Sequence, residues 1–505
     1  MPAQMSATIP FSAAQPRSKV PLGTVAGYGI GQLGAQIFRD TPAVLLPVFM
    51  TTMLGVPAWL SGFAILLPKL WLIVCDPMVG LWSDRIKDRR GRTPFLLWGS
   101  ILTSLGFLAL FTITGYGGPY LAAGGVCLLF WFASTAFSLY SVPYLAIAAE
   151  LSPDRHERTR IMAYRMIATM GGVLLGVGIA QPMVYSLGGG VYAWHTLGWS
   201  FAAICLVSMI IPALALRRTK LLAGGQPQDN FLAQFRPILA NRPFMTLLTA
   251  TFVQGIGQAS SYTVIGYFYL YALGEVSIIL KMVLVMMVGS AISQPTFYLL
   301  SQRFGKERMY MVASGLWTAI TVTWYFVKPG SAALVTLPLL GTVTEQGALV
   351  LLRAFLLGIT NTGFLLLALS MLTDTIEYQR RTTGIAREGV FSGVWSAAEK
   401  LAFAMGPLIA GLVMSWYGYQ SSQTGAVAQS DDAVVGIKLL YSLIPATMQL
   451  ISLLIFSRYR LDPQVLEGEW DGDVALAVER SDAGLPTPDR ASSVTGRPGR
   501  SRRGE

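Results

Sequence analysis

The stretch that decides the fold is Cys75–Arg92, "CDPMVGLWSDRIKDRRGR". It begins inside an apolar run with an Asp-Pro pair and ends with five basic residues in eight positions, Arg85 to Arg92. A long apolar run followed at once by positive charge is typical of a membrane-spanning helix that ends at the cytoplasmic surface. The stretch therefore predicts a spanning segment that buries one carboxylate, Asp76, and is anchored by the basic cluster.

Composition extends this interpretation to the whole chain. Of its 505 residues, 53% are hydrophobic and only 12% are charged, whereas about 25% are charged in a typical soluble domain. Apolar runs near the roughly 20 residues that cross a bilayer recur along the chain. The twelve expected spans are 23–52, 58–83, 94–117, 119–150, 160–186, 194–216, 243–272, 276–301, 309–328, 346–373, 388–417 and 434–457.

The placement of charge predicts the orientation. The net charge is +11, and basic residues cluster after every second span, while loops such as "LGVPAWLSG" (54–62) and "SLGGGVYAWHTLG" (186–198) carry no Lys or Arg. By the positive-inside rule, both termini are cytoplasmic in an integral, multi-pass protein of the plasma (inner) membrane. This placement explains the positive charge without nucleic acid, and we expect none as a partner.

Residues for other chemistry are scarce. The three cysteines (Cys75, Cys127 and Cys205) all fall in expected spans, and the two histidines, His156 and His195, lie in different loops. This set predicts no disulfide framework, no zinc site and no histidine-based catalytic site. No GxxxxGK[ST] phosphate loop is present. We therefore expect no enzyme activity, no metal and no cofactor.

An internal repeat divides the spans six and six. "DPMVGLWSDR" (Asp76–Arg85) is echoed by "QPTFYLLSQR" (Gln294–Arg303), each in the second span of its half. Two such halves with a site between them describe a transporter of twelve helices. The expected division is a cytoplasmic segment 1–22, a six-helix bundle 23–216, a linker 217–242, a second bundle 243–458 and a disordered cytoplasmic tail 459–505.

Charged residues inside the spans are the candidates for function. Each costs about 2.5 to 3.5 kcal/mol at a helix centre on insertion scales, so such residues face the interior and find partners or water. A structural role, tying one helix to another, is weighed evenly against function for Lys69 and Arg353. A role in a shared polar cavity is favoured for four residues on four helices: Asp40, Asp76, Arg165 and Lys400.

Two longer motifs resemble a known family. "DPMVGLWSDRIKDRRGRTPFLLWG" (76–99) and "LTDTIEYQRRTTGIAREGVFSGVWSAAEKLAFAMG" (372–406) are similar to signatures of the glycoside-pentoside-hexuronide:cation symporters, the melibiose-carrier branch of the major facilitator superfamily. The resemblance covers about residues 20 to 460. It implies an all-α membrane protein with two pseudo-symmetric six-helix halves that moves a solute together with a cation.

The resemblance also implies roles for individual residues. Asp40 matches the family's sugar-binding aspartate, and Arg165 and Lys400 match the basic residues that hold the cavity together. Asp76 matches the second of two carboxylates that bind the coupling cation. The expected coupling residues are Asp76 and Asp40, and the expected substrate-binding residues are Asp40, Arg165, Lys400, Ser141 and Tyr144.

Several positions depart from the family pattern. The first coupling carboxylate is replaced by Leu72, and the polar residue before Asp76 is Cys75. Sodium wants several oxygen ligands, whereas a lone buried carboxylate suits a proton. We therefore expect H⁺ as the coupling ion, with Na⁺ as the alternative. Ser141 and Leu145 replace an acid and an aromatic of the sugar site, which argues against melibiose itself.

The substrate class stays open at this point. A different glycoside, a uronate or a related small organic solute is favoured, and a lysolipid-like carrier is the alternative. A non-transporting scaffold or sensor is the alternative from another class. We expect a monomer in the bilayer that works by alternating access, with gating contacts from Asp84, Arg85, Arg89, Arg92, Glu150, Arg303, Asp374 and Glu377.

Overall fold

The computed structural model describes residues 20–152, 155–217, 241–330, 333–337, 341–383 and 388–461. Nearly all of the expected N-terminal segment, most of the linker and nearly all of the tail lie outside these residues. The domain division at 1–22, 217–242 and 459–505 therefore stays a prediction.

The first half consists of six helical rods. The third rod is short, with 20 residues. The fifth consists of three consecutive pieces, because a π-helical turn interrupts it. The bounds are α1 (Leu22–Thr52), α2 (Ala58–Arg90), α3 (Thr93–Thr112), α4 (Pro119–Glu150), α5 (Arg155–Val173) continued by η1 (Leu174–Ile179) and α6 (Ala180–Ser186), and α7 (Val191–Ala215).

The second half repeats this plan. Its bounds are α9 (Arg242–Tyr267) with the π turn η3 (Phe268–Ala272), α10 (Ile278–Phe304), α11 (Lys306–Thr323) with η4 (Trp324–Phe326), α12 (Glu345–Thr383), α13 (Glu388–Trp416), and α14 (Asp431–Tyr441) followed by α15 (Leu443–Phe456). A short antiparallel hairpin, β1 (Ala333–Leu337) with β2 (Gly341–Thr344), precedes α12. The all-α fold class is confirmed, and this hairpin is a local addition that the apolar pattern did not predict.

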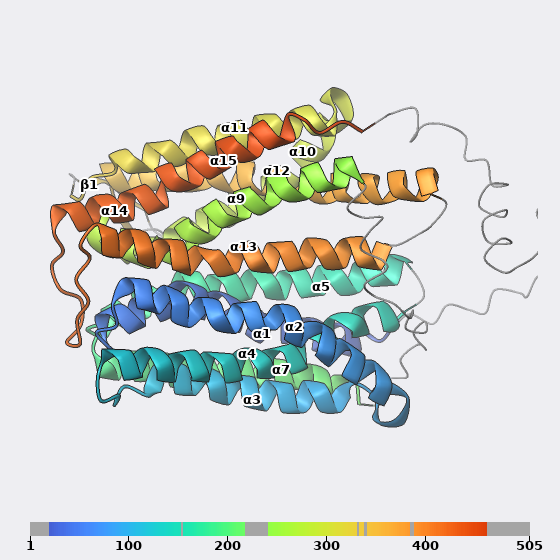
Figure 1. Ribbon diagram of the computed structural model, residues 1–505, viewed down its shortest axis with the longest axis horizontal. Helices are drawn as coiled ribbons and strands as arrows, with labels where there is room; N and C mark the ends of the chain where they lie inside the picture. The colour runs from blue at the N-terminus through green and yellow to red at the C-terminus, as the bar shows by residue number, and fades with distance from the viewer. Residues whose placement is uncertain are drawn as a thin grey trace, which may run out of the picture.

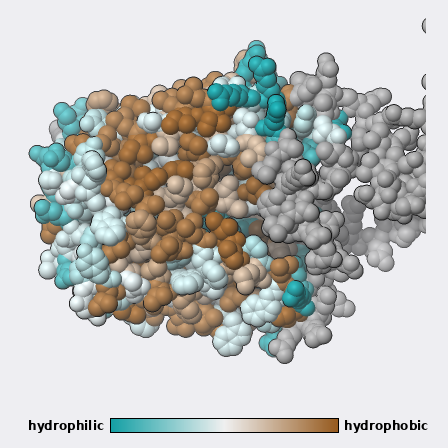
Figure 2. Space-filling view, in the orientation of Figure 1, coloured by the Kyte–Doolittle hydropathy of each residue, from teal (hydrophilic) through white to brown (hydrophobic). Residues whose placement is uncertain are grey.

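The helices match the expected membrane crossings. In the described part of the chain, nine helical segments are long and apolar enough to cross a bilayer, and α1, α9 and α11 complete a bundle of twelve. A broad band of hydrophobic side chains covers the face shown in Figure 2, with more polar residues toward the end at the left. Such a band is what a lipid-facing surface requires.

The two halves lie side by side with their helices nearly parallel (Figure 1). Helices α1 to α7 fill the lower part of that view, α9 to α15 fill the upper part, and α13 runs along the boundary. The halves meet where α2 packs on α13, α1 on α9 and η1 on α10. The space between them is where a transporter of this architecture holds its substrate.

Two glycines allow α2 and α13 to approach closely. A Cβ added at Gly62 would lie 2.6 Å from the carbonyl oxygen of Pro407, and one at Gly411 would lie 2.3 Å from the carbonyl oxygen of Ala58. Backbone atoms cannot move aside to make room for a Cβ at such short distances. The close contact between the halves therefore requires glycine at both positions.

Candidate substrate and coupling site

Asp76 lies in the contact between the two halves. Its carboxylate accepts a hydrogen bond from the Ser138 hydroxyl on α4 and another from the Lys400 ammonium on α13. The side chain of Asp76 is 15% exposed and that of Lys400 45%. The predicted coupling carboxylate of the first half is therefore ion-paired with a predicted substrate residue of the second half.

The immediate surroundings of Asp76 offer few other oxygens. Leu72, one turn earlier on α2, is apolar, and Cys75 is buried. The nearby Thr135 hydroxyl is already engaged by the indole N–H of Trp71 at 3.0 Å and itself donates to the Trp131 carbonyl. Among the described side chains, Ser138 is the neutral oxygen ligand that the hydrogen bonds assign to this carboxylate.

Asp40 makes a second connection between the halves. It is buried in α1, where it accepts a hydrogen bond from the Gln36 amide at 2.8 Å and lies 3.8 Å from the Arg39 guanidinium. The Tyr262 hydroxyl on α9 also donates to it. Asp40 therefore faces the second half, as Asp76 does, but through a neutral phenol instead of an ammonium.

The π turn η1 packs against the Asp40 region. The Thr41 hydroxyl donates to the Gly176 carbonyl at 3.3 Å, and a Cβ at Gly176 would lie 3.5 Å from that of Asp40. On its other side, Gly178 faces Leu280 and Val283 of α10. An irregular turn that contacts both halves beside a buried carboxylate is typical of a functional segment.

Arg165 lies on α5 without a carboxylate in the described part of the chain. Its guanidinium donates to the Gln32 amide oxygen at 2.9 Å and sits 5.5 Å from the centre of the Tyr144 ring. The structure does not pair Arg165 with Asp40. Among the described residues its positive charge has no ion-pair partner, and its contacts with Gln32 and Tyr144 lie within the first half.

The α4 residues that were predicted to bind substrate differ in their exposure. Tyr144 is fully buried, stacks on Tyr28 at 4.5 Å and exchanges two hydrogen bonds with that residue. Ser141 is partly exposed, and within the described residues its hydroxyl has no hydrogen-bond partner. In this conformation the Ser141 hydroxyl is accessible to a solute, whereas the Tyr144 ring packs against the Arg165 guanidinium.

At one end of the bundle, Arg92 binds both predicted gating carboxylates of the first half, Asp84 and Glu150. It is buried, and its guanidinium donates to Asp84 at 2.5 Å, to both Glu150 oxygens at 2.8 and 3.1 Å, and to Ser83 at 2.7 Å. Burial alone lowers the pKa of Arg92, but the bonds to Glu150 and Asp84 outweigh burial and raise it. We call this end of the bundle the basic end. The hydrogen bonds of Arg92 join α2, α3 and α4 there.

The second half has a corresponding pair at the basic end. Lys306, at the start of α11, donates to both oxygens of Asp374 on α12 at 2.6 and 2.9 Å. Glu377 is bound instead by Arg380 and Arg381 of its own helix. Of the other predicted gating cations, Arg85 and Arg303 are exposed, Arg303 over the Phe304 ring, and the side chain of Arg89 lies outside the described residues.

At the opposite end, the two halves are joined directly. The segment 417–430 between α13 and α14 crosses to α1, where the backbone N–H groups of Ser422 and Gly425 donate to the carbonyls of Thr51 and Thr52 at 2.7 and 2.9 Å. The hydroxyls of Thr51 and Tyr267 are 2.8 Å apart. By contrast, the ion pairs given above for the described residues of the basic end each join residues of one half. The hydrogen bonds between Thr51, Thr52 and the second half therefore describe a conformation closed at the opposite end.

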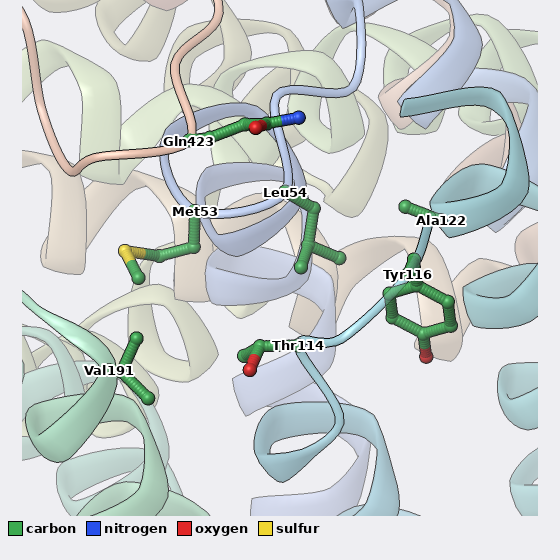
Figure 3. Close-up of a pocket in the computed structure, with 7 residues that line it drawn as sticks. All are labelled: Met53, Leu54, Thr114, Tyr116, Ala122, Val191 and Gln423. Carbon is green, nitrogen blue, oxygen red and sulfur yellow. The ribbon is translucent and has the colours of Figure 1, made fainter. Parts of the chain in front are cut away.

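A small cavity lies within this closed end (Figure 3). It has a volume of about 200 Å³ and is lined by loop and helix-end residues of the first half, with Gln423 reaching in from the second. It contains no charged residue and is lined by none of the predicted site residues. It belongs to the closure and not to the candidate substrate site.

Comparison with known proteins agrees with this geometry. Residues 27–463 match the model of the family described as MFS/sugar transport protein. The chain belongs to this family. It is 23% identical to the "Putative glycoside/cation symporter YagG" of Escherichia coli, over 93% of this chain and 98% of that protein, and 24% identical to the "Glucuronide carrier protein homolog" of the same organism, over 87% and 92%.

Among solved structures, the fold resembles that of a D-xylose-proton symporter, with a TM-score of 0.61 at 14% identity over 88% of this chain and 98% of that one. This likeness shows the MFS fold alone. Together with the family match, it makes the chain an integral, multi-pass symporter of the MFS class and not an enzyme. The expected membership of the glycoside-pentoside-hexuronide symporters is confirmed.

Two polar residues of this MFS transporter were missed from the sequence. Ser138 binds Asp76, and Tyr262 binds Asp40. Ser138 lies three residues before Ser141 and so shares its face of α4, which was an available signal. Tyr262 carried no comparable signal, because an aromatic residue in an apolar span most often packs.

Proposed function

We propose that this MFS symporter couples the movement of a small polar organic solute, a glycoside or a uronate, to that of a proton, with Asp76 as the proton-carrying group. The observation that supports this proposal is the ion pair between Asp76 and Lys400, which joins the two halves within the membrane-spanning helices α2 and α13. The basic end faces the cytoplasm in this proposal, as the positive-inside rule predicts.

The proposed mechanism follows from the charge on Asp76. Ionised, the carboxylate holds the Lys400 ammonium and keeps α2 against α13. Protonated, it loses the attraction of the ion pair, so α2 and α13 separate more easily and the halves can rock about the central site. The Ser138 hydroxyl can serve either state, since a hydroxyl both donates and accepts.

A proton is favoured over sodium because of the atoms around Asp76. A hard cation needs several oxygen ligands, and the carboxylate here shares its space with an ammonium, a leucine and a buried cysteine. A proton needs only the carboxylate itself. Sodium coupling would require Lys400 to move away and oxygens from elsewhere to replace it.

The polar groups beside Asp40 support a hydroxylated solute. Gln32, Gln36, Asp40 and Tyr262 supply acceptors and donors on α1 and α9, and sugar hydroxyls need dense hydrogen bonding in a water-poor site. The names of the relatives, a glycoside/cation symporter and a glucuronide carrier homologue, point to the same class of solute.

The test uses purified protein in liposomes with p-nitrophenyl β-D-glucuronide and p-nitrophenyl β-D-glucoside. Uptake of either solute is measured under an imposed pH gradient or an imposed sodium gradient. We expect the pH gradient to drive uptake in the wild type and in Glu399→Gln, a neighbouring carboxylate variant, and to fail in Asp76→Asn. Uptake that responds to sodium alone contradicts the proton assignment.

A further inference from the structure

The connection between α13 and α14, residues 417–430, is longer than a turn between two helices requires. Its counterpart in the first half, between α6 and α7, is only the turn 187–190, so the pseudo-symmetry of the halves does not account for it. In Figure 1 it is the orange loop at the left, which descends from α14 to the level of the first half. Long connections without helix or strand are usually functional when they are ordered. We call residues 417–430 the strap.

The base of the strap is anchored in the second half. The Tyr419 ring is buried and packs edge-on against the rings of Tyr267 and Tyr271, with ring centres 5.4 and 5.9 Å apart. The backbone N–H of Gln420 donates to the Gln429 side chain at 2.8 Å, and the Gln429 amide donates back to the Gln420 carbonyl at 2.9 Å. This reciprocal pair joins the two ends of the strap, which therefore projects as one unit from α13 and α14.

The tip of the strap rests on the first half through uncharged contacts. The backbone N–H groups of Ser422 and Gly425 donate to the carbonyls at the end of α1, as described above. Between them, the Gln423 side chain lies against the turn that follows α1, because a Cβ added at Gly55 would be 2.7 Å from the Cγ of Gln423. Gln423 also lines the small cavity, together with Leu54 (Figure 3). The strap contains no charged residue, so no ion pair holds its tip.

Contacts of this kind suit a segment that is repeatedly released. A backbone N–H that leaves a carbonyl at the end of the bundle can bind water instead, so each such bond adds little net stability. Gly418 at the base and Gly425 at the tip have φ values of +74° and +110°, a region that glycine enters without steric cost. A Cβ at either position would meet nothing within 4 Å. The backbone therefore has room to turn at both places.

We infer that the strap is a mobile gate that holds the opposite end closed, and that its tip must leave α1 in every transport cycle. In the closed state Gln423 covers the cavity and packs on Gly55. When the halves rock apart, the strap leaves the first half together with α13 and α14, in which its base is anchored. This inference goes beyond the proposed function and depends on neither the solute nor the coupling ion.

Labelling of the purified protein in detergent tests the gate without transport. Leu54 is 4% exposed and lies in the cavity beside Gln423, so Leu54→Cys should react slowly with a maleimide. Adding Gln423→Ala should accelerate this reaction about fivefold, because the side chain that packs on the turn after α1 is lost. The wild type, with its three native cysteines, gives the background rate.

Gln420→Ala is the matched control for this experiment. It truncates a glutamine of the same strap whose described hydrogen bonds are made by its backbone. Labelling of Leu54→Cys should therefore be as slow with Gln420→Ala as with the unchanged strap.

A disulfide tests whether the tip has to move. Gly55→Cys combined with Gln423→Cys places the two Cβ atoms within reach of a disulfide. Oxidation of this double variant in liposomes should abolish the uptake of p-nitrophenyl β-D-glucuronide, and dithiothreitol should restore it. Each single variant should be insensitive to the oxidant. Because Gly55 has a φ of +66°, Leu54→Cys with Gln423→Cys is the second pair, should Gly55→Cys not fold.

Two results would overturn the inference. One is labelling of Leu54→Cys that does not change with Gln423→Ala. The other is uptake by the cross-linked protein, with its disulfide verified by mass spectrometry, as fast as by the reduced protein, which would make the strap a permanent bridge that moves with the first half. Failure of the proposed function looks different: if the wild type takes up neither nitrophenyl sugar, or responds to sodium alone, the labelling experiment still decides whether the strap is a gate.

Discussion

The carboxylate of Asp76 on α2 is paired with the ammonium of Lys400 on α13, so this ion pair joins the two halves of the transporter within their membrane-spanning helices. Each group neutralises a charge that would otherwise stand in a poorly hydrated space. Protonation of Asp76 ends the attraction between the two groups without leaving two separated charges. It therefore releases the contact between α2 and α13 at a lower cost in free energy than pulling the charged pair apart.

The pair predicts a specific mutational pattern. Lys400→Gln leaves Asp76 without its cation, and Asp76→Asn leaves Lys400 without its anion, so both should lower the thermal stability of the purified protein. The double variant removes both charges and should recover most of the lost stability without recovering uptake. Melting curves of the four proteins in detergent check this. If the double variant loses as much thermal stability as the two single variants added together, the two residues do not interact.

Asp40 should matter for solute affinity more than for coupling. Asp40→Asn keeps the size of the side chain but removes the charge that orients Arg39 and accepts from Tyr262. We expect the Kd for p-nitrophenyl β-D-glucuronide to rise about tenfold, while uptake at high solute concentration still responds to the pH gradient. Tyr262→Phe should show a smaller rise. A loss of pH response at saturating solute would instead move the proton carrier to Asp40.

Arg92 should be a main source of stability at the basic end. Its side chain is buried and donates to Glu150, Asp84 and Ser83, so Arg92→Ala removes the hydrogen bonds and ion pairs that it makes with two carboxylates and should cost about 3 kcal/mol. Arg85→Ala, at an exposed position of the same helix end, should melt like the wild type. If both variants melt alike, the cluster is not holding α2, α3 and α4 together.

Ionisation of Arg92 should not make its contribution to stability depend on pH in the range where the protein is studied. Its pKa is raised above the ordinary value of an arginine by the bonds to Glu150 and Asp84, so its stabilising contribution is complete below the ordinary value and is lost only as pH rises through the raised one. The difference in melting temperature between wild type and Arg92→Ala should therefore not reflect ionisation of the guanidinium anywhere between about pH 6 and 9. A difference that vanishes toward pH 9 contradicts this assignment.

The close contact of α2 with α13 predicts a conformational effect of small substitutions. Gly62→Ala and Gly411→Ala each add a Cβ that meets backbone atoms of the other half, so both should disfavour the state closed at the opposite end. Labelling of Ser415→Cys, whose hydroxyl position contacts the Trp59 N–H, by a membrane-impermeant maleimide should accelerate in both. Gly315→Ala, which meets open space, is the control. Unchanged labelling would mean that the helices separate elsewhere.

Much of the fold followed from the sequence because span length is set by the bilayer. The expected span 58–83 corresponds to α2, which continues to Arg90 because the charged end of the helix extends into water. The same extension carries α12 to Thr383, ten residues past the expected end of its apolar run. The π turns and the break at Ser442 were not predicted, because they depend on packing against neighbouring helices.

The site was only partly predictable for a different reason. The cost of a buried charge requires that Asp76, Lys69 and Lys400 find partners or water, but it does not say which helices meet. The sequence therefore identified the charged residues without their pairing. Lys400 was assigned to the solute and is bound to Asp76, while Lys69, for which a structural and a functional role were weighed evenly, has no ion-pair partner among the described residues. Resolving such alternatives requires the relative rotation of helices.

Proton movement with the solute tests the central claim most directly. Lightly buffered liposomes with a pH-sensitive dye inside and the protein in their membranes are given p-nitrophenyl β-D-glucuronide outside, without any imposed ion gradient. We predict internal acidification that follows solute entry in the wild type and is absent in Asp76→Asn and in protein-free liposomes. Solute entry without acidification, accompanied by sodium entry, would contradict the account.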